Sequence, residues 1–224
     1  MSDYMTEYKR WLDCGDNDER LELKGLTEDQ IKERFYADLE FGTAGMRGII
    51  RTGTNGMNCR TVSRATLGLA EYIKSCGPQA ASRGVVISYD SRLKSAEFAS
   101  LTARVLAQAG VKAILYDALR PVPLLSFGVR YFKAFAGVMI TASHNPKEYN
   151  GYKVYGEDGA QLAPEAAAEV LKEINKLDYF SIPCADMEQA LSQGMIALAG
   201  KEVDDAYLAA ILPLADMEII NKQS

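Results

Sequence analysis

The spacing of apolar positions changes several times along the chain, and each change predicts a different element. Residues 1–40 place apolar side chains at helical intervals among charged ones, which predicts a helical N-terminal arm. Residues 41–50 break that pattern with three glycines around an arginine and then begin a short apolar strand. Helical spacing returns at 58–76 and ends at Gly77-Pro78, a pair that stops helices.

Short apolar runs then alternate with helical segments. The runs predicted to be strands are 84–90, 112–117, 136–141 and 152–156, the last returning from the third by a hairpin. The predicted helices are 94–109, 121–133, 163–177, 185–193 and 202–212. Strands that alternate with helices of this length predict an α/β fold with a layered, largely parallel sheet.

Composition narrows the functional classes. The chain has 224 residues, 48% of them apolar, which is enough for a substantial core. A net charge of -5, with no basic run, argues against nucleic acid as a partner. The N-terminus is too charged for a signal peptide, and no apolar run is long enough to span a membrane. Four scattered cysteines and a single histidine argue against zinc and predict reduced thiols in a cytoplasm.

In layered α/β sheets, ligands bind beyond the carboxyl ends of the strands. The loops of interest therefore follow Asp90, Asp117 and Thr141. The third loop lies in the stretch ITASHNPKEYNGYK, residues 140–153, and places the only histidine beside a serine. These are also ordinary turn residues, so a purely structural loop is the alternative.

The order of residues in this stretch argues against acyl transfer. The serine stands in T-A-S-H rather than G-x-S-x-G, and no histidine follows position 144 to complete a Ser-His-Asp triad. Phosphoryl transfer fits better, because it depends on positioning and neutralisation of charge rather than on a triad. Lys153 and Arg47 are the cations available beside turns or glycines.

The combination of motifs resembles a known family. T-A-S-H-N-P followed by N-G-Y-K resembles the phosphoserine signature of the α-D-phosphohexomutases, the phosphoglucomutase/phosphomannomutase superfamily. F-G-T-A-G-M-R-G resembles the N-terminal motif of that family, and Y-D-S-R stands between the two in the family's order. The resemblance covers about residues 35–200 and implies a three-layer α/β/α domain, the family's domain I, with a mainly parallel but mixed sheet. The N-terminal arm looks most like the branch that acts on glucose or pentose phosphates.

The resemblance also implies roles for individual residues. Ser143 would carry the phosphoryl group, exchange it with a hexose 1-phosphate or 6-phosphate through a sugar bisphosphate, and provide one ligand to Mg²⁺. Arg47 and Lys153 would stabilise charge and assist proton transfer, and His144 would line the same pocket. Hexose 1,6-bisphosphate would act as the activator. Arg92 would either support the site or form an ion pair at the surface.

Other parts of the family pattern are absent from this sequence. It contains no Asp-x-Asp-x-Asp-Arg metal loop, no Glu-x-Ser-Gly sugar loop and no late phosphate-binding loop. The acidic run at 16–19 lies far upstream of the serine motif and is interpreted as solvated surface. We therefore expect an N-terminal arm at 1–40, domain I at 41–200, and a connector at 201–224 towards missing domains II–IV.

Three functional hypotheses follow. The leading one is that the chain is the phosphoserine-bearing fragment of a phosphohexomutase and is inactive alone. The second is a stand-alone, non-catalytic module that binds sugar phosphates or a protein partner. The third is a subunit that meets a separate chain carrying the missing loops.

Overall fold

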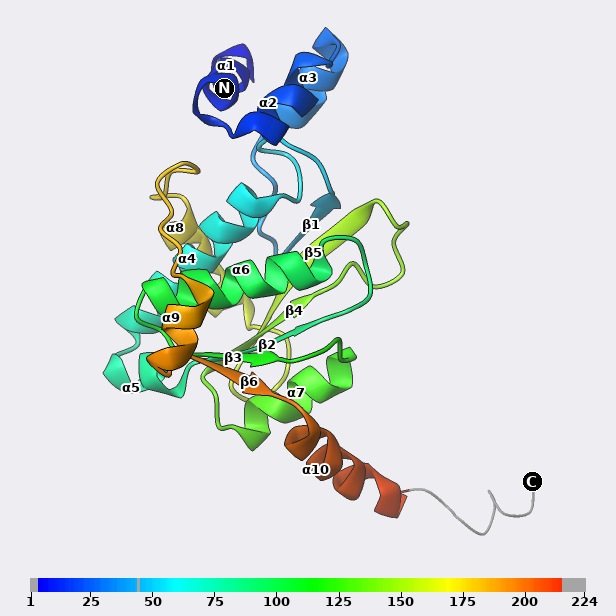
Figure 1. The fold of residues 1–224 in the computed structure, drawn as a ribbon, viewed down its shortest axis with the longest axis vertical. Helices are drawn as coiled ribbons and strands as arrows, with labels where there is room; N and C mark the ends of the chain where they lie inside the picture. The colour runs from blue at the N-terminus through cyan, green and yellow to red at the C-terminus, as the bar shows by residue number, and fades with distance from the viewer. Residues whose placement is uncertain (1–3, 44, 215–224) are drawn as a thin grey trace, which may run out of the picture.

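The computed structural model describes residues 4–43 and 45–214 and shows a mixed sheet with helices on both faces (Figure 1). Within these residues the sheet has six strands in the order β1-β5-β4-β2-β3-β6. The strands are β1 (Gly45–Ile49), β2 (Val85–Tyr89), β3 (Ala113–Tyr116), β4 (Ala136–Ile140), β5 (Tyr149–Tyr155) and β6 (Ile196–Ala199). The helices are α1 (Tyr4–Cys14), α2 (Asn17–Lys24), α3 (Glu28–Phe35), α4 (Cys59–Ser75), α5 (Pro78–Arg83), α6 (Ser95–Gln108), α7 (Val122–Tyr131), α8 (Pro164–Ile174), α9 (Met187–Ser192), α10 (Lys201–Ile211) and the 3-10 turn η1 (Leu212–Leu214).

The sheet is parallel in its centre and antiparallel at one side. β2 pairs in parallel with β3 and β4, and β3 pairs in parallel with β6. β5 runs antiparallel to both β4 and β1. This confirms the predicted three-layer α/β/α fold with a mainly parallel, mixed sheet, including the hairpin return after β4. β5 begins at Tyr149, earlier than the predicted start at 152.

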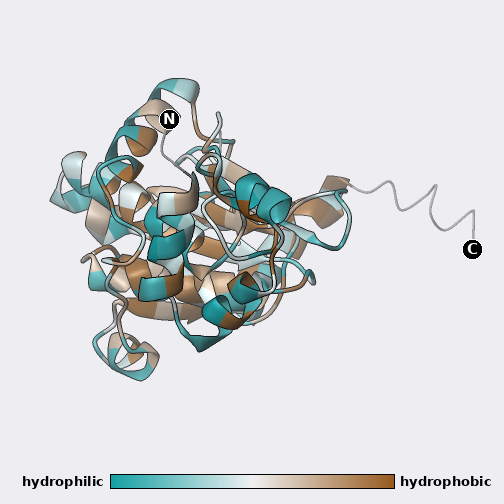
Figure 2. Ribbon diagram, turned by 90° about the horizontal axis from the view of Figure 1, so that it is seen from above, coloured by the Kyte–Doolittle hydropathy of each residue, from teal (hydrophilic) through white to brown (hydrophobic). Residues whose placement is uncertain are grey.

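Helices cover the two faces of the sheet unequally. α4, α6 and α8 lie on one face (Figure 1), where the larger apolar core includes Leu69, Leu106 and Val138. α7 and α10 lie on the other face, where a smaller core includes Leu125 and Val203. Apolar segments gather between the layers in Figure 2, as burial of apolar surface requires. Among the described helices, none has the length and apolar character needed to cross a bilayer.

Two elements escaped prediction. Gly77 does end α4, but the following proline starts α5, because proline is well suited to the first turn of a helix. β6 is only four residues long, and its two inner residues are exposed while its ends are buried. Such a strand has neither a continuous apolar run nor an alternating pattern, so sequence spacing gives no signal for it.

The N-terminal arm, predicted as helical, consists of α1, α2 and α3. Its centre is Trp11, whose side chain is fully buried. The indole contacts Phe35 edge to face at 5.8 Å between ring centroids, and Tyr179 and Phe180 at 5.5 and 5.4 Å. Because Tyr179 and Phe180 lie beyond α8, these aromatic contacts attach the arm to the α/β domain.

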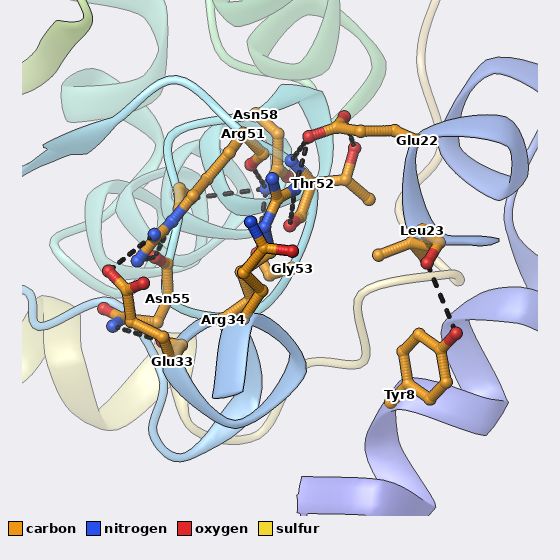
Figure 3. A network of polar contacts seen from close by, with 12 residues as sticks. Tyr8, Glu22, Leu23, Glu33, Arg34, Arg51, Thr52, Gly53, Asn55 and Asn58 are labelled. Carbon is orange, nitrogen blue, oxygen red and sulfur yellow. Dashed lines mark hydrogen bonds and ion pairs between the residues drawn. The ribbon is translucent and has the colours of Figure 1, made fainter. Parts of the chain in front are cut away.

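A polar network attaches the same arm to the loop that follows β1 (Figure 3). The Glu22 carboxylate accepts hydrogen bonds from the Thr52 hydroxyl, from the Thr52 amide at 3.3 Å, and from Arg34. Burial opposes ionisation of this carboxyl, but the hydrogen bonds outweigh it and hold the pKa of Glu22 below its ordinary value. Arg51 donates to Glu33 at 2.8 Å. The N-terminal arm therefore restrains the loop at the end of β1 through contacts made outside the sheet.

The predicted connector at 201–224 is described only in part. Residues 201–211 form α10, which packs beside α7, and η1 follows it. Residues 215–224 of the connector lie outside the described residues, as do residues 1–3 of the arm.

Phe35→Ala should detach the arm from the domain. Removing a buried phenylalanine typically lowers the free energy of unfolding by about 3–5 kcal/mol. Trp11 is the only tryptophan of the chain, so its fluorescence during urea unfolding reports the arm directly. As a control, Leu21→Ala removes a side chain that is 75% exposed and should change stability by no more than about 0.5 kcal/mol. A Phe35→Ala transition at the wild-type midpoint would contradict this packing.

Candidate active site

Ser143 has an unusual backbone conformation at the end of a buried strand. β4 is buried along its whole length, and the chain then turns so that Ser143 is exposed. Its φ is +58°, in the left-handed region that residues with a Cβ rarely adopt. The Ser143 amide donates to the Thr141 hydroxyl at 3.0 Å. Such strained residues concentrate at functional sites, which favours the functional interpretation of the loop over the purely structural one.

His144 lies beside the serine, but not as a member of a triad. The Ser143 Oγ and His144 Nδ1 atoms are 3.4 Å apart, a long contact between two exposed side chains. Among residues 4–43 and 45–214, no carboxylate is hydrogen-bonded to the imidazole to orient it as a general base.

The two predicted cations come from adjacent antiparallel strands. In the β1–β5 register Arg47 faces Gly151, and Gly45 faces Lys153. Their neighbours Met46 and Tyr152 point into the core, so strand alternation places Arg47 and Lys153 together on the opposite face. Arg47 and Lys153 are therefore diagonal neighbours on the two strands, a separation that long side chains can span.

Of the two cationic side chains, only Arg47 has a hydrogen-bond partner within the described part of the chain. Arg47 Nη1 donates to Asn145 Oδ1 at 2.9 Å, which brings it to the serine loop. Lys153 is half-buried and makes no hydrogen bond or ion pair with any described residue. An ammonium group without a counter-ion among the described residues is available to an anionic ligand at this face.

Glycines permit the close approach of these strands to the loop. A Cβ on Gly151 would lie 2.6 Å from the Thr141 carbonyl oxygen and 3.0 Å from that of Met46. Gly45 has φ +137°, and a Cβ there would lie 1.9 Å from the Tyr152 carbonyl oxygen. Each of the two sequence motifs thus contains a glycine that the packing requires.

A cleft of about 690 Å³ opens beside Ser143, between the loop and the β2–α6 turn. Its lining residues are Asp90, Ser91, Arg92, Leu93, Ser143, Asn145 and Lys147. Arg92 pairs with Asp90 at 3.4 Å and donates to the Ser143 carbonyl at 2.6 Å; its side chain is 15% exposed, so it is not the surface arginine of the alternative prediction. Sequence reasoning missed Asn145 and Lys147, although both belong to the same loop.

The described residues do not by themselves form a magnesium site. No group of three or more potential metal-binding side chains occurs within the described ranges. The carboxylate nearest the loop in the hydrogen-bond network, Asp90, is already engaged by Thr141 at 2.7 Å and Ser95 at 2.8 Å. Mg²⁺ prefers carboxylate and phosphate oxygens, so Ser143 would provide at most one ligand through a bound phosphoryl group.

The acidic run at 16–19 is only partly the solvated surface that was predicted. Asp16 is exposed but caps α2, accepting from the Glu19 amide at 2.9 Å. Glu19 is half-buried and accepts two bonds from Arg60 Nε and one from Arg60 Nη2 at 2.6 Å. The interpretation as solvated surface was therefore wrong for Glu19, which joins the arm to α4.

A second cavity, near the start of α4, contains Cys59. Burial and the hydrogen bond to Glu97 raise the pKa of the Cys59 thiol to about 12. A thiol with such a pKa remains protonated at neutral pH, so it is a poor nucleophile.

Comparisons with known proteins agree with this geometry. The family model for phosphoglucomutase/phosphomannomutase, alpha/beta/alpha domain I, matches residues 38–180. A phosphoglucomutase from Staphylococcus epidermidis is 43% identical over 203 residues, which cover 87% of this chain and 36% of that protein. A phosphoglucomutase from Staphylococcus saprophyticus is 40% identical over 182 residues, which cover 81% of this chain and 32% of that protein.

Solved structures give the same result for the fold. A protein from Thermus thermophilus, assigned as a phosphomannomutase, superposes with a TM-score of 0.61 at 29% sequence identity. The match covers 81% of this chain and 37% of that protein. The chain thus spans about a third of the length of the curated relatives it matches.

Gly151→Ala should destabilise the protein, because the added methyl group overlaps two carbonyl oxygens. Such overpacking costs about 1–3 kcal/mol in the free energy of unfolding, measured by urea titration and circular dichroism. Gly25→Ala is the matched control: φ is -89° there, and the nearest atom to an added Cβ is 4.0 Å away. That substitution should be neutral or stabilise by about 0.4–1 kcal/mol. Equal stability of the two variants would contradict the close approach at Gly151.

Proposed function

This chain belongs to the phosphoglucomutase/phosphomannomutase family, and from that membership we propose that it is the phosphoserine-bearing domain of a phosphohexomutase. The reaction would interconvert hexose 1-phosphate and hexose 6-phosphate. The observation that carries the proposal is the conformation of Ser143, exposed at φ +58° on the loop whose Asn145 accepts from Arg47, with Lys153 on the same sheet face as Arg47. Relatives named phosphoglucomutase favour glucose phosphates among the hexoses.

In the proposed reaction, Ser143 transfers one phosphoryl group to the sugar and then receives another from it. The bond between Ser143 Oγ and phosphorus breaks as a sugar hydroxyl oxygen bonds to phosphorus and loses its proton. The resulting hexose 1,6-bisphosphate turns over, and Ser143 Oγ accepts the phosphoryl group from its other end. The same bisphosphate, supplied in solution, would phosphorylate an empty serine and so act as the activator.

The cations have distinct proposed roles. Arg47 and Lys153 would neutralise the charge of the transferred group, which is the main requirement of phosphoryl transfer. Lys153, without a partner among the described residues, would also be available to exchange a proton with the sugar hydroxyl. His144, beside Ser143 Oγ, would line the sugar side of the pocket.

Mg²⁺ is part of the proposal only for the longer protein. It would neutralise phosphoryl charge, and a phosphoserine oxygen at Ser143 would supply one ligand. The remaining ligands and the sugar-recognition loop would come from residues outside those described. We therefore propose that the 224-residue chain alone does not turn over hexose phosphates, and that the complete enzyme is cytoplasmic.

Ser143→Ala should abolish hexose phosphate interconversion in the full-length protein, because no hydroxyl remains to carry the phosphoryl group. The measurement is conversion of glucose 1-phosphate in the presence of Mg²⁺ and glucose 1,6-bisphosphate. Ser91→Ala is the matched control, since it removes another exposed hydroxyl from the wall of the same cleft. Wild-type turnover by Ser143→Ala would refute the phosphoserine role, whereas no turnover by the wild-type full-length protein would favour a non-catalytic, sugar-phosphate-binding module.

Lys153→Ala in the full-length protein should lower kcat by about 10²- to 10³-fold and raise KM much less, because the cation acts mainly in the transition state. Arg47→Ala should behave similarly. Steady-state kinetics at saturating bisphosphate separate the two constants. Lys172→Ala, which removes an exposed lysine paired with Glu169 on α8, should leave both constants unchanged. A raised KM with unchanged kcat for Lys153→Ala would mean that the residue only binds substrate.

A further inference from the structure

The strained conformation of Ser143 is held at both of its backbone polar groups. Its amide donates to the Thr141 hydroxyl at 3.0 Å, and its carbonyl accepts from Arg92 Nη2 at 2.6 Å. A serine at φ +58° would otherwise relax towards the conformations that its Cβ favours. These two hydrogen bonds therefore hold the backbone from which the serine hydroxyl projects.

Arg92 binds the whole loop, not Ser143 alone. Its guanidinium donates to the backbone carbonyls of Ser143 at 2.6 Å, Asn145 at 2.8 Å, Pro146 at 2.9 Å and Tyr149 at 3.3 Å. The side chain is only 15% exposed. A planar guanidinium has enough donors to reach several carbonyls in a fixed geometry, whereas a lysine ammonium does not.

Asp90 connects the two restraints on Ser143. One carboxylate oxygen accepts from the Thr141 hydroxyl at 2.7 Å and lies 3.4 Å from Arg92 Nε. The other accepts from the Arg92 amide at 3.0 Å and from the Ser95 hydroxyl at 2.8 Å. Thr141 and Ser95 are 4% and 1% exposed and the Asp90 side chain is 26% exposed, so the two hydroxyl donors, but not the whole carboxylate, are shielded from water.

The same contacts also set the position of Arg47. Asn145 presents its backbone carbonyl to Arg92 and its side-chain oxygen to Arg47 Nη1 at 2.9 Å. Arg92 thus fixes the residue to which the proposed catalytic cation is bound. Movement of Arg92 would displace Ser143 and Arg47 together.

We propose that Arg92, Asp90 and Thr141 position the Ser143 hydroxyl and Arg47 relative to each other for phosphoryl transfer. This assignment rests on the proposed function of Ser143. The three are positioning residues because they act through the backbone of the loop and through Asn145. Phosphoryl transfer is sensitive to such alignment, since a displacement of about 1 Å can cost on the order of 10²-fold in rate.

Arg83 offers a matched comparison for Arg92. It also donates to two backbone carbonyls, those of Lys133 at 2.9 Å and Ala134 at 3.2 Å, and it pairs with Glu157. These contacts lie away from the serine loop. A substitution at Arg83 therefore tests the effect of losing an arginine that binds backbone carbonyls, and it leaves Arg92, Asp90 and Thr141 unchanged.

The first experiment measures amide hydrogen exchange over residues 143–149 of the 224-residue chain. Arg92→Lys keeps the charge but loses most of the carbonyl contacts, so exchange there should rise by about tenfold or more. Thr141→Val should raise it as well, and Thr141→Ser, which retains the hydroxyl, should restore the wild-type rate. Arg83→Lys should leave this segment unchanged. Equal exchange in Arg92→Lys and Arg83→Lys would overturn the proposal.

The second experiment measures kcat and KM for hexose phosphate interconversion in the full-length protein. Arg92→Lys and Thr141→Val should lower kcat by about 10²-fold with little change in KM, and Thr141→Ser should recover most of it. A loosened loop with wild-type kcat would overturn the positioning role and leave the proposed function intact. No turnover by wild type, with exchange altered as expected, would refute the proposed function while supporting the restraint of Ser143.

Discussion

The site depends on the register of β5 between β1 and β4. Because the strands alternate, the pairing of Met46 with Tyr152 in the core obliges Arg47 and Lys153 to share the opposite face. A slip of one residue would turn Lys153 into the core and Tyr152 out of it. The antiparallel return of β5 also places its start next to the loop after β4, where Ser143 lies. One register therefore places both cations on one face and the start of β5 next to the serine loop.

Much of this arrangement could be predicted from the sequence, for physical reasons. Strands covered by helices on both faces have near-continuous apolar runs, so β2, β3 and β4 were readily predicted. β6 is short and half-exposed and gave no such signal. The carbonyl contacts of Arg92 join residues as many as 57 positions apart, and that approach depends on tertiary packing that spacing along the chain does not encode. The same holds for the contact of Arg47 with Asn145, 98 positions away.

The charges at this face are suited to the proposed phosphoryl group. Arg47 bonds to a neutral amide and Lys153 to none of the described residues, so neither positive charge is neutralised within the described part of the chain. Asp90 is the carboxylate nearest to the serine loop in the hydrogen-bond network. It already pairs with Arg92 and accepts hydrogen bonds from Thr141 and Ser95. Two cations on one face of the sheet, one of them hydrogen-bonded to the serine loop, are suited to bind a dianion there.

The central claim is that Ser143 carries the phosphoryl group during catalysis. The most direct test is to treat the full-length protein with isotopically labelled glucose 1,6-bisphosphate and locate the label by peptide mass spectrometry. The account predicts one labelled phosphoryl group on Ser143, which is replaced by an unlabelled one when unlabelled hexose phosphate is added. Label on another residue, or label that stays on Ser143 through this chase, would contradict it.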